Sequence, residues 1–344
     1  GTASIIWSGW VLLFTVRYLY CMMLMKKYYL CAFMFSLILI SLVGVVSSRT
    51  FVKDSCTSAA NVAECFVTKV DNMLKNQGVA PTLAYINDVI LTESGHAVVH
   101  SALHLVGEYA YSEERDLSAT FAFVEPYAKK YVESRDHLNG FDGFYHGAIT
   151  AFFYLNKEKN VNDLIAKVCE QNLTLLGKVT SDPFECYHSV GHALLYFKDN
   201  KPEDALVICD QQSDERKKRG CYYGVFMEHA SLYAPAYHPY SPKDSVLGDS
   251  TAGLCLLQKG IRAELCAHFV GQSHLAMKPN DVQGAFAECK KVSEYYEECM
   301  QRIESMFVTY LFRGDYKKMV QTCDFAEPQF KERCVEAIDY GLSM

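Results

Sequence analysis

The sequence lacks the short motifs that usually identify a reaction. It contains fourteen cysteines but no C-x-x-C motif, which argues against a thioredoxin-type redox site and against a cysteine-ligated zinc site. No C-x-x-C-H sequence occurs either, and this excludes covalently attached c-type haem. Neither the G-x-S-x-G motif of hydrolases nor the G-x-x-x-x-G-K-[ST] motif of phosphate-binding loops is present. The motifs therefore assign no reaction.

The sequence also has no stripe of Lys and Arg residues. Its formal net charge is −7 over 344 residues. Proteins that bind nucleic acid through phosphate contacts need a basic surface, so no nucleic-acid partner is expected. Half of the residues are apolar, which is enough for a sizeable core in one large or two average domains.

The N-terminal residues 1–48 differ from the rest of the chain. Tyr28–Val46 is an uncharged apolar run that follows Lys26 and Lys27. From Met25, an alternative start, the segment reads as a signal peptide, and the same run is long enough to remain as a membrane anchor. Both interpretations place the remainder of the chain outside the cytoplasm, whether secreted, periplasmic or membrane-anchored.

The cysteines outside this segment occur in pairs. An even number of cysteines in an exported chain favours disulfide bonds over free thiols. Cysteines that are neighbours in sequence are separated by 9 to 17 residues within a pair, and pairing of neighbours is the simplest scheme. The predicted disulfide cysteines are Cys56 with Cys65, Cys169 with Cys186, Cys209 with Cys221, Cys255 with Cys266, Cys289 with Cys299 and Cys323 with Cys334.

Each of the later pairs sits inside a helical pattern. The strings N-V-N-D-L-I-A-K-V-C, P-E-D-A-L-V-I-C and D-Y-K-K-M-V-Q-T-C end in the first cysteine of a pair and begin with residues that suit helix starts. The second cysteine opens another apolar helical run, as in C-Y-H-S-V-G-H-A-L-L-Y-F and, from Cys266, C-A-H-F-V-G-Q-S-H-L-A. The second cysteines recur every 33 to 45 residues, and Phe144 and Ser94 fill the same position in two upstream segments without cysteine. This period predicts an all-α fold, an α-solenoid of antiparallel helical hairpins stapled by disulfides.

This pattern resembles the disulfide-stapled Sel1-like and tetratricopeptide-type helical repeat proteins. The resemblance covers roughly residues 160–340 and concerns architecture, because the consensus residues of those repeats are not met. It implies paired helices in a curved array, whose concave face would bind another protein. The strings C-Y-H-S-V-G-H and C-Y-Y-G-V-F-M-E also look like segments of uncharacterised exported microbial proteins. We expect helical N-terminal repeats with a histidine-rich helix over 49–160 and the stapled hairpins over 161–344.

The histidines follow the same repeat. When the segments are aligned on the second cysteine, four histidines fall two residues after it, and two more fall four residues later on the same helix face. A His-x-x-x-His pair can present two imidazoles to one metal ion, and imidazole suits zinc, copper and iron. Neither pair has the glutamate of the H-E-x-x-H metalloproteases. The predicted metal ligands are His96, His100, His188 and His192, with His146 and His268 in support.

Two other interpretations of these histidines stay open. They could form a structural network with some of the 23 tyrosines in a scaffold that binds a protein or ligand without metal. They could also form the centre of a metal-dependent enzyme whose reaction the sequence does not indicate. Four glycines close to the histidine positions are expected to allow close helix packing, namely Gly147, Gly191, Gly224 and Gly271.

Overall fold

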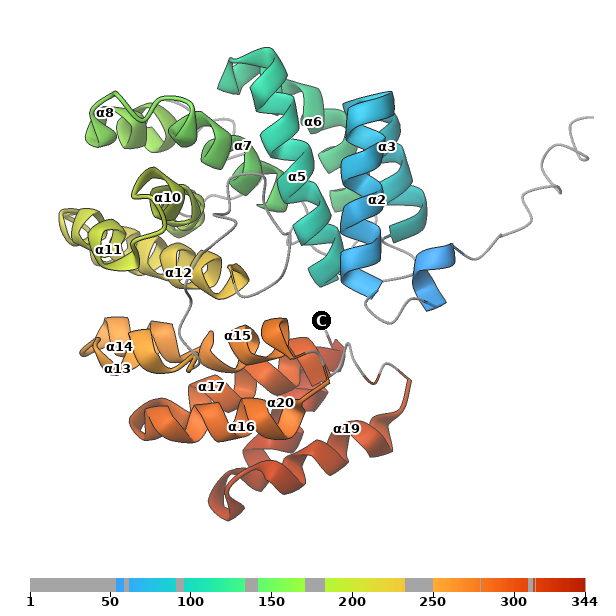
Figure 1. Ribbon diagram of the computed structural model, residues 1–344, viewed down its shortest axis with the longest axis vertical. Coiled ribbons are helices and arrows are strands. Elements are labelled where there is room, and N and C mark those ends of the chain that lie inside the picture. The colour runs from blue at the N-terminus through green and yellow to red at the C-terminus, as the bar shows by residue number, and fades with distance from the viewer. Residues whose placement is uncertain are drawn as a thin grey trace, which may run out of the picture. The chain divides into compact units, whose positions relative to one another are not determined.

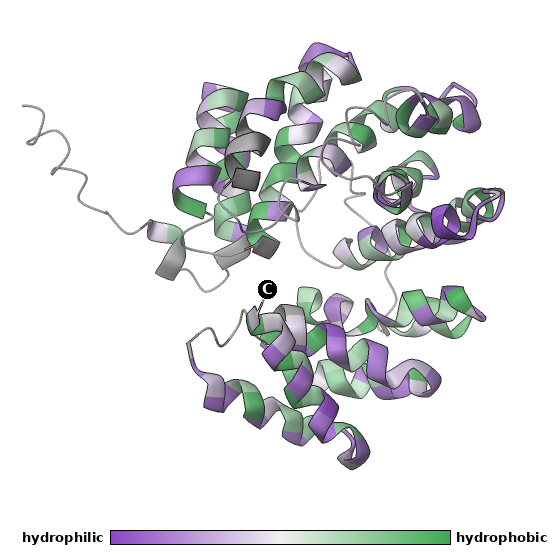
Figure 2. Cartoon of the chain, turned by 180° about the vertical axis from the view of Figure 1, so that it is seen from behind, coloured by the Kyte–Doolittle hydropathy of each residue, from purple (hydrophilic) through white to green (hydrophobic). Residues whose placement is uncertain are grey.

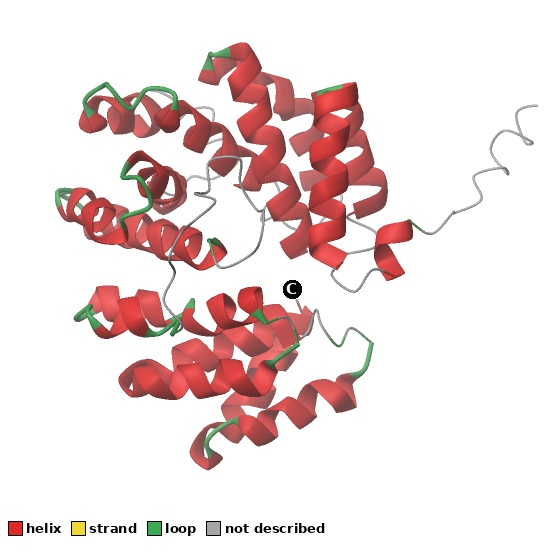
Figure 3. Cartoon of the chain, in the orientation of Figure 1, coloured by secondary structure: helices red, strands yellow, loops and turns green. Residues whose placement is uncertain are grey.

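The computed structural model describes residues 54–58, 62–90, 96–133, 142–170, 183–232, 250–278, 280–308, 312 and 314–343, which form helices joined by turns and loops (Figures 1 and 3). No strand occurs in these ranges, so the predicted all-α class is confirmed there. The elements belong to one compact unit, Ser55–Met344. The predicted signal peptide or anchor lies outside the described residues. Among the described helices, none combines the length and the hydrophobicity needed to cross a membrane.

The first half of this unit carries long helices. Its elements are η1 (Ser55–Ser58), α2 (Val62–Gln77), α3 (Val79–Tyr85), η2 (Ile86–Ile90), α5 (His96–Glu114), α6 (Leu117–Glu133), α7 (Asp142–Tyr154), α8 (Val161–Ile165), η4 (Ala166–Glu170), α10 (Pro183–Phe197), α11 (Pro202–Asp210) and α12 (Glu215–Ser231).

The second half is built from shorter helices. They are α13 (Gly253–Leu256), α14 (Ile261–Ala267), α15 (Val270–Met277), α16 (Val282–Cys289), η5 (Lys290–Tyr295), α17 (Tyr296–Arg302), η6 (Ile303–Val308), α19 (Tyr316–Thr322), η7 (Cys323–Phe325), η8 (Pro328–Phe330) and α20 (Lys331–Ser343).

Several helices start where the sequence predicts, because a polar side chain or a proline caps the first turn. Asn160 accepts a hydrogen bond from the backbone N–H of Asn162 at 2.8 Å, and Asp315 accepts one from that of Lys318 at 3.0 Å. Pro202 occupies the first turn of α11, where its missing N–H costs nothing. These caps satisfy N–H groups that have no partner within the helix.

Six disulfides join successive helical elements. The sulfur atoms of all six neighbouring pairs lie between 1.93 and 2.11 Å apart, in the pairing that the sequence predicts. Cys209 of α11 is bonded to Cys221 of α12, and Cys289 of α16 to Cys299 of α17. The order of helix, cysteine, turn, cysteine, helix is thus present in three dimensions.

The hairpin of Cys255 and Cys266 departs from the prediction in one respect. The two cysteines are bonded, as expected, and join α13 to α14. The expectation that Cys266 opens one continuous apolar helix is wrong, because α14 ends at the next residue and α15 begins only at Val270. The backbone N–H of Phe269 donates to the carbonyl oxygen of Cys266 at 3.0 Å, an i to i+3 bond that tightens the chain and ends the α-helix. His268 therefore lies between two helices and not on one unbroken helix face.

The helices that occupy the second-cysteine position of successive repeats, including α5 and α7 in the repeats without cysteine, pack against one another in chain order. α5 packs on α7, α7 on α10, α10 on α12, and α12 on α14 and α15. Most helices show both green and purple segments in Figure 2, as expected when one face is buried. α7 and α10 differ, because Gly143–Phe153 and Cys186–Tyr196 are buried without interruption. These two helices lie at the centre of the packing.

Candidate metal centre

Glycines bring the helices of two pairs into backbone contact. A Cβ atom at Gly147 of α7 would overlap the backbone oxygen of His104 in α5, and one at Gly224 of α12 would overlap that of His188 in α10. Backbone atoms cannot move away as a side chain can, so only glycine allows these approaches. The prediction that glycines permit close packing agrees with these contacts.

The two pairs, α5 with α7 and α10 with α12, repeat the same set of contacts. Gly107 would meet the oxygen of Phe144, just as Gly191 would meet that of Cys221. This equivalence places His104 where His188 stands in the second pair. Alignment from sequence used Ser94 as the repeat origin of α5, whereas the contacts set it eight residues later, at residue 102. The histidine of α5 that matches His188 is therefore His104 rather than His96.

Two histidine pairs, one in α5 and one in α10, lie close together in this part of the packing. In α5 the Nε2 atoms of His100 and His104 lie 3.1 Å apart, and in α10 those of His188 and His192 lie 3.0 Å apart. Two imidazoles on one ion with bonds of 2.0–2.1 Å in tetrahedral geometry have nitrogens about 3.3 Å apart. Each pair is therefore close to the spacing that shared coordination requires.

His146 of α7 lies between the two pairs. Its ring centroid is 5.1 and 5.2 Å from those of His100 and His104, and 4.7 and 4.5 Å from those of His188 and His192. One ligand nitrogen from each of His100, His104 and His146 falls within 4.8 Å of the others, and the same is true of His146, His188 and His192. We call these five residues the histidine cluster.

Four of the five histidines in the cluster are buried and His100 is half-buried, and His146 and His188 are uncharged at neutral pH. His146 and His192 are 1% exposed, and His104 is 4% exposed. Burial, reinforced by the surrounding imidazoles, holds the pKa of His146 well below its ordinary value. Burial likewise lowers the pKa of His188 to about 4, although the hydrogen bond that Glu185 accepts from His188 acts in the opposite direction. Neutral imidazole is the form that binds metal ions.

Carboxylates surround the cluster as partners of its outer nitrogens. The Nδ1 atom of His192 is in close contact with Oε2 of the buried Glu228, whose Oε1 accepts a hydrogen bond from the Tyr196 hydroxyl at 2.5 Å. On the other imidazole of α10, Nδ1 of His188 lies 3.4 Å from Oε2 of Glu185. A carboxylate that binds Nδ1 fixes the ring and directs the lone pair of Nε2 toward a metal ion.

A further acid lies near Glu185. Burial, with the negative charge of Glu185, raises the pKa of Asp142 at the start of α7 to about 7. Asp142 therefore changes its charge near neutral pH, one turn before His146 on the same helix.

The predicted ligands divide into three groups. The structure brings His100, His146, His188 and His192 together, whereas the side chain of His96 lies outside what it describes. His268 is not part of the cluster. The ring of Tyr223 lies between His268 and the cluster. Its centroid is 5.2 Å from that of His188 and 6.3 Å from that of His268.

The metal ligands predicted from the sequence do not include His104. Its signal was visible, because His100 and His104 are four residues apart, like the other pairs. The contact of Glu228 with His192 depends on the packing of α12 against α10, which no local sequence pattern indicates.

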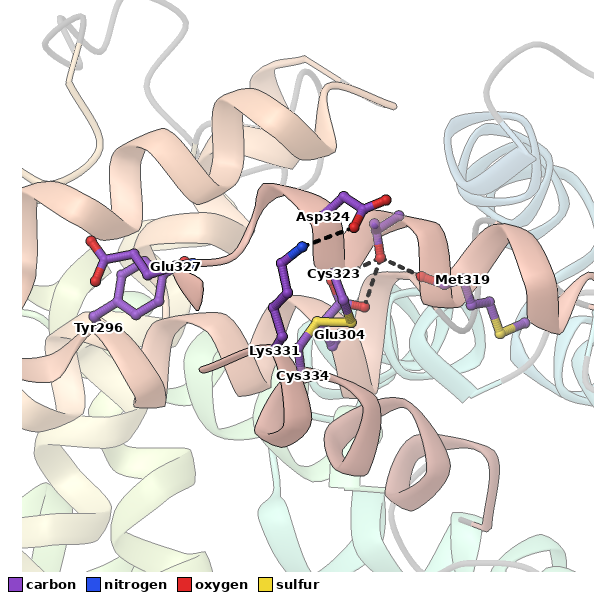
Figure 4. The surroundings of a disulfide bond; sticks show 9 residues. Tyr296, Glu304, Met319, Cys323, Asp324, Glu327, Lys331 and Cys334 are labelled. Atoms are coloured by element: carbon purple, nitrogen blue, oxygen red, sulfur yellow. Dashed lines mark hydrogen bonds and ion pairs between the residues drawn. A yellow bond between two sulfur atoms is a disulfide. The ribbon is translucent and has the colours of Figure 1, made fainter. Parts of the chain in front are cut away.

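A third set of possible donors combines Glu304 with Cys323 and Cys334 (Figure 4). The two sulfur atoms are bonded to each other, so neither is available as a thiolate ligand. We therefore treat this set as a structural feature of the last hairpin.

Comparison of the chain with protein families, with curated proteins and with solved structures finds no match. The function of the chain is therefore inferred from the geometry of the histidine cluster.

Proposed function

We propose that this protein binds a transition-metal ion, zinc, copper or iron, through the histidine cluster. The observation that carries the proposal is the convergence of five imidazoles from three helices, with both His-x-x-x-His pairs placed Nε2 to Nε2 at 3.0–3.1 Å. The chemistry of the donors agrees with it, since first-row ions of this class prefer imidazole.

A purely structural role of the cluster accounts less well for His146. Its Nδ1 atom is buried, and no hydrogen-bond partner reaches it among the described residues. An unsatisfied buried polar atom costs about 1–3 kcal/mol. If His146 only packed the core, an apolar residue of similar size would avoid that cost. A bound ion would instead give the imidazole a strong partner.

Export and a solenoid architecture form part of the same proposal. Six disulfides are typical of proteins that fold in an oxidising compartment, which supports an extracytoplasmic location. The packing of successive hairpins in chain order supports a stacked array of the solenoid type. In this array the metal centre would occupy one segment, and the surface of the remaining hairpins would be open to a protein partner.

Elemental analysis of the purified, unmodified protein tests the proposal. We expect at least one bound transition-metal ion per chain, and less bound metal in the double variant His188→Ala/His192→Ala than in the unmodified protein. The matched control is His268→Ala, which removes a half-buried histidine next to the cluster and should keep the metal. Circular dichroism of each variant checks that it remains folded. Absence of bound metal, after purification without chelator and after incubation with zinc, would refute the proposal.

The same double variant distinguishes a metal-dependent enzyme from a protein-binding scaffold. A scaffold that binds protein through its outer surface should keep its partner when the buried imidazoles are removed. A metal-dependent enzyme should lose metal and turnover together.

A further inference from the structure

The histidine cluster contains more ligands than one ion can reach. Ligand atoms on opposite sides of an ion with bonds of 2.0–2.1 Å are at most about 4.2 Å apart. The donor atoms of the described residues form two separate triads within 4.8 Å, and they do not form one group of five. A single ion placed in either triad leaves two of the imidazoles unused.

The two triads have matching composition. Each contains one i, i+4 histidine pair on a single helix, α5 or α10, together with His146 of α7. In each pair the Nε2 atoms already face each other, so each pair presents two lone pairs to one point when both rings are neutral and carry their proton on Nδ1. A hydrogen bond between the two nitrogens can satisfy one lone pair in the absence of metal, and an ion can satisfy both.

His146 is the member that both triads share. An imidazole has two nitrogens, and Nδ1 of His146 is buried with no hydrogen-bond partner among the described residues. Binding through both nitrogens requires loss of the ring N–H proton to solvent, and two adjacent cations favour the anionic ring that results. The buried carboxyl group of Glu228, in contact with Nδ1 of His192, also lies beside the site.

From this geometry we infer that the cluster is a two-metal centre, with one divalent transition ion at His100 and His104, a second at His188 and His192, and His146 between them. The inference rests on the proposed function, since it concerns the same cluster. It adds the number of ions and assigns the pair on α5 to a site of its own.

Metal stoichiometry tests the inference separately from the proposed function. The metal-free protein is titrated with zinc, excess is removed by gel filtration, and zinc and protein are measured in the same fractions. We expect two ions per chain in the unmodified protein and one in each of the double variants His100→Ala/His104→Ala and His188→Ala/His192→Ala. Saturation of the unmodified protein at one ion overturns the two-metal centre and leaves the proposed function intact. Saturation at zero overturns both.

Copper provides a second measurement that needs no variant of the cluster itself. Two copper(II) ions joined by one imidazolate couple magnetically, so the electron paramagnetic resonance signal should rise with the first equivalent of copper and fall with the second. A signal that rises to two full equivalents without loss shows that His146 does not bridge the ions, and this would overturn its assignment. His229→Ala, which removes a half-buried histidine outside the cluster, serves as the control and should give the same titration curve as the unmodified protein.

Discussion

Replacement of Glu304 by glutamine should make the protein more stable at neutral pH. Glu304 is completely buried in η6, and burial raises the pKa of its carboxyl group to about 8, in spite of the hydrogen bond with Thr322. The geometry agrees with a protonated acid. The Thr322 hydroxyl has one proton, and the backbone oxygen of Met319 at 2.5 Å can only accept it. A carboxyl oxygen of Glu304 lies 2.9 Å from the same hydroxyl, so a protonated Glu304 can donate to the hydroxyl oxygen while the hydroxyl donates to Met319 (Figure 4).

The size of the effect follows from proton linkage. The folded protein holds the Glu304 proton up to about pH 8, whereas the unfolded chain releases it near the ordinary glutamate pKa of 4.5. Stability from this group is fully present below pH 4.5 and is lost as the pH rises toward 8. Each pH unit in this window costs about 1.4 kcal/mol, which amounts to about 3 kcal/mol at pH 7 and about 5 kcal/mol at pH 8. Glutamine has nearly the same shape and stays neutral, so it avoids this cost.

Urea unfolding at pH 4.5, 7 and 8, with the disulfides intact, measures the difference between Glu304→Gln and the unmodified protein. We expect the variant to gain stability relative to the unmodified protein as the pH rises. Glu288→Gln is the matched control of opposite sign. Although burial opposes it, the hydrogen bond from Lys291 at 2.5 Å lowers the pKa of Glu288, so its loss should destabilise the protein at pH 7. A difference between Glu304→Gln and the unmodified protein that does not change with pH would refute a protonated Glu304.

Three further predictions concern the packing, the disulfides and the cluster. Gly147→Ala should lower the free energy of unfolding in urea by about 3 kcal/mol or more and reduce metal binding, because the new Cβ overlaps the backbone of His104. The control Gly253→Ala has open space around the new Cβ and should leave both quantities unchanged. Dithiothreitol should abolish the cooperative melting transition. Each disulfide closes a loop of 9 to 17 residues and contributes about 3 kcal/mol to the free energy of unfolding, so the six together exceed the stability of a typical domain. An unchanged melting curve would contradict this. Glu228→Gln should weaken zinc affinity about 10- to 100-fold by isothermal titration, while Glu215→Gln at the start of the same helix should leave it unchanged.

Much of the helical organisation was predictable because its signals are local. Caps such as Asn160 and Asp315 act within one helical turn, and the apolar spacing of each hairpin is read over about ten residues. The cysteine period added long-range information, since each close pair marks the two helices of one hairpin. Where a repeat contains its cysteine, as at Cys186 and Cys221, the helix register taken from sequence agrees with the backbone contacts. The helix around Cys266 is an exception, because it ends at Ala267. The break comes from backbone hydrogen bonding that the apolar pattern does not reveal.

The candidate site was less predictable, because its geometry depends on contacts between helices. α5 has no cysteine to fix its register, so the alignment placed its histidines two turns from their structural position. The contact between Glu228 and His192 spans 36 residues of sequence, and no local pattern indicates it. Glu304 lies in the string Q-R-I-E-S-M, which reads as an ordinary amphipathic helix, and only the packing of α19 and α20 on η6 shows that it is buried.

The distribution of disulfides suggests what a metal ion would contribute to the fold. No cysteine occurs between Cys65 and Cys169, so α5 and α7 are not stapled to any neighbour, although every later hairpin is. These two helices carry three members of the histidine cluster, and coordination would link them to α10. A ligand that binds only the folded state stabilises the helices that it connects. Removal of metal with a chelator should therefore speed hydrogen exchange in α5 and α7, while α16, α17 and α20 keep their protection through Cys289–Cys299 and Cys323–Cys334. Equal loss of protection in both halves would show that metal acts on the whole unit, and no change in either half would show that the cluster is stable without it.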